Sequence, residues 1–516
     1  MKVRLLLREI SEFIVALFTV AILFPVPKSS YAADTLGVWN VKQYPYPAYG
    51  DGSHDDTQAI QAHIDSAYKH NGGVVLFPSG NYLISGTLKL HSKVYLKGVG
   101  GTTFGGTGFD PGYNPTNFED SLTCRITLTS GNIVDMVRTD TLFYQSGIEN
   151  IALVGNRNIS SSTDTNSTGC RGIYIPDVGN QYRSQAMFRN IIIYGTKGTG
   201  FYDGTNQHEI NLSYVEVINC GWNGFTIKGQ DCKISRCGAG GNSMSGFYIT
   251  GGGSGRYYDV DAWGNNLGFE IRDVINLFFF GLETNVNKTN GLYIGPSSSP
   301  SGWSPSWIEI FRGLFSDNST VGSGSYSDVF LTSQSNGFGP PHILFSGCQF
   351  MGFQSSGHPS YPIQDASVTP RQNVVADCNF YVSGYTSSKV INNNGIYQFR
   401  DCIYEDNTNG LGVYGTNTMK FVFVSSNYQM KPFDGQVNAS AGGGTVTVTL
   451  PDLNQVPVGT VYYVSRADQT ANTLNVQAFG TQTINNSSSV PVNGYLTTLM
   501  ITQMGSQWRA SKMVAP

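Results

Sequence analysis

Acidic side chains recur at a regular spacing in the central part of the chain. Asp261 and Glu283 are 22 residues apart, and Asp259 lies two residues before Asp261. Hydrolysis of a glycosidic bond needs two carboxyl groups, one protonated and one ionised, on either side of the sugar oxygen. Two carboxyl groups held close together favour that state, because their like charges raise the pKa of one of them. The acids therefore predict glycoside-cleaving chemistry, provided that the fold brings them together.

Another acid, Glu270, lies in a different setting. Tyr248 and Tyr293 come one repeat before and after it, and Arg272 follows two residues later. Aromatic rings with a few hydrogen-bonding side chains are typical of sugar-binding sites, although outward tyrosines also favour cross-strand packing alone. We expect these residues to bind substrate, and Glu270 is an alternative catalytic acid. The other residues expected to bind substrate are Lys228, Arg236, Trp222 and Trp263.

A repeat in the middle of the chain must position these side chains. A glycine followed by an apolar residue recurs at spacings of 28, 24, 22, 22 and 23 residues, in Gly172, Gly200, Gly224, Gly246, Gly268 and Gly291. Each unit contains short alternating strands separated by Asn- and Gly-rich turns, as in one coil of a parallel β-solenoid. The signature of leucine-rich repeats is absent, and propeller blades are about twice as long. We therefore predict an all-β, right-handed parallel β-helix.

Stacking of the coils converts sequence positions into columns. One outward column is predicted to contain Tyr174, Tyr202, Thr226, Tyr248, Glu270 and Tyr293, with Lys228 and Arg272 two residues further on. A second outward column is predicted to contain Asn219, Arg236, Asp261 and Glu283. Each of these residues directly precedes a small residue that is expected to point inward. Neighbouring rungs lie about 4.8 Å apart, so Asp261 and Glu283 would face one substrate. Asp259 is predicted on the same face, and Trp222 and Trp263 at the turns.

The N-terminal part of the mature chain resembles a known family. Trp39-Asn-Val-Lys, Tyr49-Gly-Asp-Gly-Ser-His-Asp-Asp-Thr and Gly72-Gly-Val-Val-Leu-Phe-Pro-Ser-Gly resemble the start of pectate-lyase-superfamily β-helix proteins. Phage tailspike depolymerases and many secreted polysaccharidases share that start. The resemblance covers residues 39 to 100 and implies the fold, but it leaves the reaction open.

The acid-rich segment between residues 51 and 56 is interpreted as structural. We expect Asp55 or Asp56, together with Thr57, to form the N-cap of an amphipathic helix. This helix would cover the open end of the solenoid. Asp51-x-Ser53-x-Asp55 lacks the glycine and the closing glutamate of a calcium loop, and His54 is expected to face solvent. No pair of histidines has metal-ligand spacing. We therefore predict no metal site here.

The last eighty residues differ from the repeat. From Asp434 the chain becomes rich in Val and Thr, as in Gly442-Gly-Gly-Thr-Val-Thr-Val-Thr-Leu. This composition predicts antiparallel strands in a small β-sandwich. The segment resembles C-terminal modules of phage tail spikes and fibres, which implies trimerisation or sugar binding.

The first residues have the features of a secretory signal peptide. Lys2, Arg4 and Arg8 precede an apolar run from Phe13 to Phe24 and a small-residue exit near Ala33. An uncleaved anchor is the alternative, because Glu9 and Glu12 are unusual in such a region. The eight cysteines are expected to be buried and stacked in register, as the repeated contexts of Cys348, Cys378 and Cys402 indicate.

Together these observations predict a secreted polysaccharide-degrading enzyme. Its expected parts are a signal peptide (1–33), an N-terminal cap with the first rungs (34–100), the parallel β-helix (101–433) and a C-terminal β-rich module (434–516). The preferred reaction is glycoside hydrolysis without a cofactor. The alternatives are a lyase acting on a uronate chain, for which calcium is an option, and a non-catalytic, spike-like sugar-binding protein. The net charge of −4 favours neither nucleic acid nor an anionic membrane as partner, and the tailspike resemblance allows a homotrimer.

Overall fold

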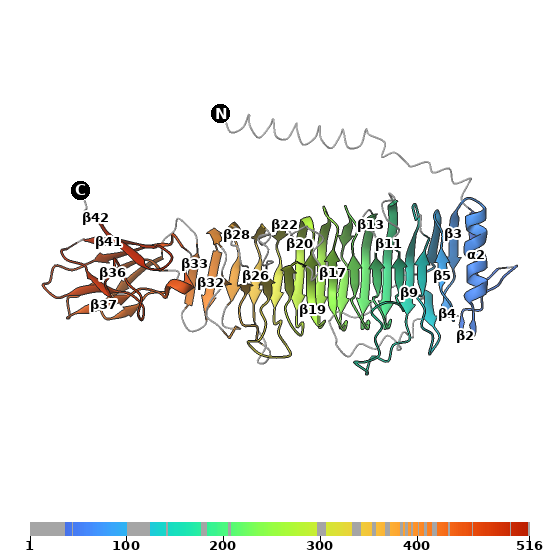
Figure 1. Cartoon of the computed structure of the whole chain (residues 1–516), viewed down its shortest axis with the longest axis horizontal. Coiled ribbons are helices and arrows are strands. Elements are labelled where there is room, and N and C mark those ends of the chain that lie inside the picture. Colours follow the sequence, from blue (N-terminus) through green and yellow to red (C-terminus); the bar gives the residue numbers. More distant parts are fainter. Residues whose placement is uncertain are drawn as a thin grey trace, which may run out of the picture.

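The protein is an elongated stack of short strands, with a helix at its N-terminal end and a separate group of strands at its C-terminal end (Figure 1). The computed structural model describes residues 37–43, 45–100, 124–140, 143–176, 183–204, 208–296, 306–332, 342–352, 358–366, 372–381, 385–386, 391–393, 396–400, 402–406, 410–414, 420–431, 434–456, 458–495 and 497–513. The predicted signal peptide lies outside these residues. In the part of the chain that they cover, no helix is long and apolar enough to span a membrane.

An 11-stranded parallel sheet forms one face of the stack. Its strands are β5 (Leu88–Leu90), β8 (Val137–Thr139), β10 (Ile173–Ile175), β12 (Phe201–Asp203), β14 (Phe225–Ile227), β17 (Ser245–Thr250), β19 (Leu267–Arg272), β21 (Leu292–Gly295), β24 (Val329–Leu331), β27 (Ile363–Asp365) and β30 (Ile391–Asn393). The register confirms the first predicted column, because Tyr202, Thr226, Tyr248, Glu270 and Tyr293 lie opposite one another in succession.

A 22-stranded sheet forms the rest of the coil. Its strands are β1 (Gly37–Asn40), β2 (Asp51–Asp55), β3 (Gly73–Phe77), β4 (Gly80–Ile84), β6 (Val94–Gly98), β7 (Cys124–Leu128), β9 (Gly147–Val154), β11 (Arg183–Tyr194), β13 (His208–Ile218), β15 (Lys233–Ser235), β16 (Gly238–Gly240), β18 (Arg256–Trp263), β20 (Ile275–Asn285), β22 (Ser306–Phe311), β23 (Leu314–Ser316), β25 (Ile343–Ser346), β26 (Gln349–Met351), β28 (Gln372–Ala376), β29 (Asn379–Tyr381), β31 (Ile396–Arg400), β32 (Cys402–Asp406) and β33 (Gly410–Tyr414). All pairings are parallel except that of β32 with β33, which is antiparallel and covers the last edge.

A corner divides the 22-stranded sheet into two arms. The corner residues have left-handed backbone conformations, for example Tyr214 (φ 55°), Arg236 (φ 52°) and Asp259 (φ 49°). One residue in this conformation interrupts the alternation of side chains and turns the strand onto a new face. We call the strand segments before the corner the first arm, and those after it, such as β16 and the ends of β13, β18 and β20, the second arm.

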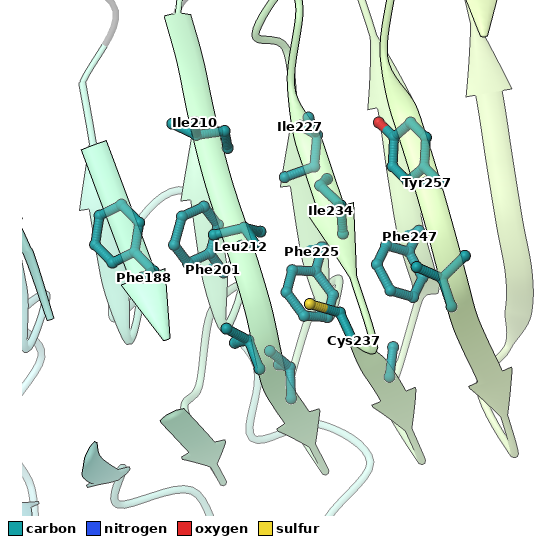
Figure 2. Close-up of a cluster of buried hydrophobic side chains, with 14 of the residues drawn as sticks. Phe188, Phe201, Ile210, Leu212, Phe225, Ile227, Ile234, Cys237, Phe247 and Tyr257 are labelled. Atoms are coloured by element: carbon teal, nitrogen blue, oxygen red, sulfur yellow. The ribbon is translucent and has the colours of Figure 1, made fainter. Parts of the chain in front are cut away.

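The core is filled by columns of identical or similar side chains. Phe225 stacks on Phe247 with ring centroids 4.5 Å apart, and Phe247 stacks on Phe269 at 4.6 Å. Figure 2 shows Phe225 and Phe247 among aliphatic side chains of the facing strands. All eight cysteines are buried and free, and the register of β26, β29 and β32 aligns Cys348, Cys378 and Cys402 as predicted.

A ladder of buried asparagines runs beside this core. Asn242, Asn265 and Asn287 occupy equivalent positions on successive rungs and are fully buried. Asn265 Oδ1 accepts from the backbone N–H and the Nδ2 of Asn242, each at 2.9 Å. Its own Nδ2 donates to Ala239 O at 2.9 Å. The ladder therefore satisfies backbone groups at the turn that the sheets leave unpaired.

The acid-rich segment near residue 51 leads into a helix, as predicted. Helix α2 (Thr57–Lys69) covers the first rungs (Figure 1), with Asp56 at its N-cap position. The buried Asp56 carboxylate accepts from the backbone N–H groups of Tyr49 (2.6 Å) and Gly50 (2.9 Å) instead of from the helix. Asp55 supplies the hydrogen bond to Thr57 N, at 3.0 Å, and His54 is exposed.

The C-terminal module differs in two ways from the sequence prediction. One sheet has five strands, which are β34 (Lys420–Val424), β36 (Asp434–Ala439), β38 (Val461–Arg466), β41 (Thr498–Gln503) and β42 (Trp508–Met513). The other sheet has four strands, which are β35 (Tyr428–Gln429), β37 (Val446–Thr449), β39 (Leu474–Gln477) and β40 (Ser489–Pro491). A 3₁₀ turn lies at Leu453–Gln455. The pairings β34–β36–β38 and β35–β37–β39 are parallel, so the expected all-antiparallel arrangement is wrong. Because β34 pairs with β36, the predicted start at residue 434 is also too late.

Candidate active site

Asp261 and Glu283 lie opposite each other on neighbouring rungs of the second arm. Asp261 of β18 pairs in register with Glu283 of β20, and both side chains are half-buried. Neither makes an ion pair with any residue that the structure describes. Asn285 Nδ2 donates to Glu283 Oε1 at 3.0 Å and orients that carboxylate. The predicted adjacency of the two acids is therefore confirmed.

The structure adds a third acid, Glu216, to this column. In register, Glu216 of β13 is followed by Gly238 of β16 and then by Asp261. A Cβ atom on Gly238 would lie 2.9 Å from Glu216 Cδ, which shows that the Glu216 carboxylate lies directly over this glycine. The missing side chain lets Glu216 approach Asp261 across one rung. We call Glu216, Asp261 and Glu283 the acid stack.

The surroundings of Asp261 and Glu216 raise the pKa of both carboxyl groups. Burial, followed by the charge of Glu283, raises the pKa of Asp261 from 3.8 to about 7. Burial, followed by the charge of Asp261, raises the pKa of Glu216 well above its usual value. Asp261 can therefore donate a proton near neutral pH, which is the requirement for a general acid.

An apolar surface borders the acid stack on its N-terminal side. Trp263 follows Asp261 by two residues and lies on the same face of the strand. A Cβ atom on Gly240 would lie 2.7 Å from the indole nitrogen of Trp263, so the Trp263 ring lies over Gly240. The ring packs against the small outward cluster of Ala152, Ile192, Tyr194 and Ile218. Trp263 is therefore a strand residue beside the acids, and its predicted position at a turn is wrong. Trp222 does lie in a turn, half-buried.

Two members of the predicted site lie elsewhere. Asp259 is at the corner and its side chain is exposed, 4.0 Å from Arg236 Nε. Arg236 is also a corner residue and contacts the hydroxyl of Tyr214. The predictions that Asp259 shares the face of Asp261, and that Arg236 and Asn219 share its column, are wrong. The corner residue breaks the alternation on which they rested.

Glu270 and the predicted substrate-binding residues form a separate surface on the 11-stranded sheet. Arg272 Nε donates to Glu270 Oε1 at 2.6 Å, and Ser245 Oγ donates to the other carboxylate oxygen. Both oxygens of Glu270 are therefore engaged. The guanidinium of Arg272 lies 4.5 Å from the ring centroid of Tyr293. Tyr248 lies in the same column.

Cations accompany the tyrosines along this surface. Lys228 Nζ lies 6.0 Å from the ring centroid of Tyr202, and the guanidinium of Arg171 lies 4.6 Å from the same ring. Arg171 also lies 3.9 Å from the ring of Tyr174. This surface combines aromatic rings with positive charge, which suits an anionic sugar chain. It does not share a sheet with the acid stack, although the sequence pattern treated both as parts of one site.

Glu216 is the residue that the column prediction missed, although the sequence contains its signal. Counting back from Glu283, steps of 22, 23 and 22 residues lead through Asp261 and Gly238 to Glu216. These steps match the period of the repeating glycines. The prediction aligned the coils by their small inward residues instead, and such residues occur at more than one position in each coil.

Comparisons with known proteins agree with the fold. Residues 38–242 match the family described as rhamnogalacturonase A/epimerase, pectate lyase-like. "Alginate lyase 7" of Azotobacter vinelandii is 48% identical over 69 residues, which are 12% of this chain and 8% of that protein. "Mannuronan C5-epimerase AlgE3" of the same organism is 31% identical over 202 residues, 37% of this chain and 10% of that protein. The matches thus span a tenth or less of these relatives.

A solved structure extends the likeness over most of the chain. Tailspike protein 2 from Escherichia coli O157:H7 bacteriophage CAB120 has a TM-score of 0.50 and 15% identity, and the match covers 93% of this chain and 62% of that one. At this identity the likeness concerns the fold alone. Together with the matches above, it shows a parallel β-helix fold, and residues 38–242 of that fold are similar to the pectate-lyase-like family, as the residues from Trp39 onward predicted.

Proposed function

We propose that the protein hydrolyses a polysaccharide, with Asp261 as general acid and Glu283 as the second carboxylate. The observation that carries this proposal is the in-register pairing of the two acids, one of which has a pKa of about 7. Asp261 would protonate the leaving oxygen while Glu283 attacks or stabilises the sugar carbon. Trp263 supports substrate binding, because its ring lies beside the acids on the same face.

The register also bears on the stereochemistry. Strands on neighbouring rungs lie about 4.8 Å apart, close to the carboxyl separation of roughly 5 Å in retaining enzymes. Glu216 belongs to a strand two rungs from Asp261, but its carboxylate lies over Gly238 on the rung between them, so the spacing of the strands does not give the separation of these two carboxyl groups. Because Glu283 and Asp261 lie on neighbouring rungs, we propose that Glu283 is the nucleophile and that the product retains the anomeric configuration of the substrate. The anomer of the first product, followed by NMR, distinguishes the two outcomes.

A second candidate is a lyase or epimerase acting on uronate residues. It is favoured by the cationic tyrosine surface of the 11-stranded sheet and by the printed names of the relatives, an alginate lyase and a mannuronan epimerase. Such chemistry abstracts a proton beside a carboxylate and needs cations to stabilise the resulting charge. Tyr248, Arg272 and Lys228 would then belong to the reacting site.

A panel of neutral and uronate-containing polysaccharides separates these reactions. New reducing ends without ultraviolet absorbance of an unsaturated sugar support hydrolysis, and both signals together indicate a lyase. A change in uronate configuration without cleavage indicates an epimerase. Binding without any reaction would overturn both proposals in favour of a sugar-binding protein.

Matched variants then locate the reaction. Asp261→Asn and Glu283→Gln should each lower turnover by roughly a hundredfold or more. Asp259→Asn is the control, because this exposed acid lies only two residues from Asp261 but at the corner. If Glu270→Gln abolishes turnover while the two acid-stack variants keep it, the reaction takes place on the 11-stranded sheet instead.

Export and assembly are further parts of the proposal. The basic start and apolar run before Ala33 support secretion, and N-terminal sequencing of protein from the culture medium tests it. The tailspike-like fold supports a homotrimer only by analogy, and light scattering of the purified protein tests that assembly.

A further inference from the structure

A cavity lies at the N-terminal end of the protein, away from the acid stack. It has a volume of about 410 Å³, and the residues lining it include Gln61, Asp65, Tyr68, Lys69, Lys89 and His91. Four of these belong to α2, and Lys89 belongs to β5, the first strand of the 11-stranded sheet. We call this hollow the cap cavity.

A histidine between two carboxylates stiffens the wall of the cap cavity. His91 Nδ1 lies 2.6 Å from Asp140 Oδ2, and His91 Nε2 lies 3.1 Å from Asp65 Oδ1. Because carboxylates only accept, both contacts are hydrogen bonds when each ring nitrogen carries a proton. The ring of Tyr68 stacks on this imidazole with centroids 4.5 Å apart. Tyr68 is thus held in place although half of its surface is exposed.

The cap cavity contains the carboxylate of Asp65 and the two ammonium groups of Lys69 and Lys89. Asp65 Oδ1 already accepts from Gln61 Nε2 at 2.8 Å and from His91. The ammonium groups of Lys69 and Lys89, in contrast, make no hydrogen bond or ion pair with any residue in the described ranges. An exposed aromatic ring and two ammonium groups that line one cavity can together hold the ring face and the acidic group of one sugar.

We propose that the cap cavity binds an anionic sugar unit of a polysaccharide, with the acidic group on Lys69 and Lys89 and the sugar ring on Tyr68. The proposal rests on the proposed function only in taking a polysaccharide as ligand, and it does not depend on the acid stack. The acidic group is a uronate carboxylate or a sulfate ester, since both accept hydrogen bonds from ammonium groups.

The position of the cavity supports a polymer as the ligand. Lys89 is the first outward residue of the column that continues, rung by rung, through Arg138 and Tyr174. A chain with one unit in the cap cavity can therefore run along the cationic tyrosine surface described above. The cavity would then fix the position of a long substrate independently of the catalytic residues.

The test measures binding of hexasaccharides by calorimetry on the full chain. An oligogalacturonate supplies carboxylates, a heparin-derived hexamer supplies sulfates, and cellohexaose is the neutral probe. We expect at least one anionic hexamer to bind roughly tenfold or more tightly than cellohexaose. Tyr68→Ala and Lys69→Gln, which change only residues of α2, should each weaken that binding about tenfold. Lys233→Gln is the control, because this exposed lysine lies on the first arm.

The outcomes separate this proposal from the proposed function. If the polysaccharide panel shows cleavage but Tyr68→Ala and Lys69→Gln bind like the unchanged protein, the cap-cavity proposal alone is wrong. If no polysaccharide is cleaved but both variants lose binding, the cavity proposal stands and the hydrolase proposal fails. Equal binding of the neutral and anionic hexamers would overturn the proposed role of the lysines. Circular dichroism of each variant confirms that the fold is retained.

Discussion

The carboxylate of Glu216 occupies the space directly over Gly238, and this places it between its own rung and that of Asp261. A side chain at position 238 would force it away. Gly238 has no left-handed backbone conformation, so its function here is to leave room and not to allow a turn. The acid stack therefore depends on a residue that has no chemistry of its own.

Replacing Gly238 with alanine tests whether the position of Glu216 matters. The added methyl group should displace the Glu216 carboxylate and lower turnover about as much as Glu216→Gln does, with little change in melting temperature. Since both changes act on one group, the double variant should lose no more activity than either single one. Full activity of Gly238→Ala would show that Glu216 has no part in the reaction.

The raised pKa of Asp261 predicts a pH dependence of stability. In the folded protein this carboxyl keeps its proton up to about pH 7, whereas its usual pKa is 3.8. The folded state thus binds more protons between these values, so its stability falls as the pH rises from about 4 to about 7. Asp261→Asn removes this loss. The melting temperature of the variant minus that of the unchanged protein should therefore be larger at pH 8 than at pH 4. If this difference in melting temperature is the same at both pH values, the raised pKa of Asp261 is contradicted.

Asp56 is expected to stabilise the N-terminal cap without affecting the reaction. Asp56→Ala leaves the N–H groups of Tyr49 and Gly50 without their buried acceptor and should lower the free energy of unfolding by about 2 kcal/mol. Chemical denaturation measures this loss. Turnover of the folded variant should stay near normal, and a large loss of activity at unchanged stability would mean that the acid-rich segment takes part in the chemistry.

The asparagine ladder makes a separate prediction about stability. Asn265→Ala removes the acceptor of the buried Asn242 N–H and the donor to Ala239 O, so the free energy of unfolding should fall by about 3 kcal/mol. Asn266→Ala is a matched control, because this neighbouring side chain is half-buried and lies outside the ladder. Equal losses in the two variants would show that the ladder contributes no more than an ordinary turn residue.

The sequence by itself determined the coil and one of its faces. In six successive strands of the 11-stranded sheet, from β10 to β21, a glycine directly precedes the first inward residue, as Gly224 precedes Phe225 and Gly246 precedes Phe247. A side chain at these glycines would meet the next rung's backbone or a ladder asparagine, as at Gly224 and Asn242 Nδ2. The motif therefore marks one position in each of these six coils, and alternation from that position assigns their outward side chains correctly.

Only the tertiary structure decided which residues accompany Asp261. The second arm has no such marker, and it follows a corner whose left-handed residue, such as Asp259, interrupts the alternation. Counting across that corner placed Asp259 and Arg236 on the wrong face. The approach of Glu216 depends on an empty position on another rung, and the pKa of Asp261 depends on burial and on Glu283, which is 22 residues away in the chain. Such effects arise between rungs, so they exist only once the coils are stacked.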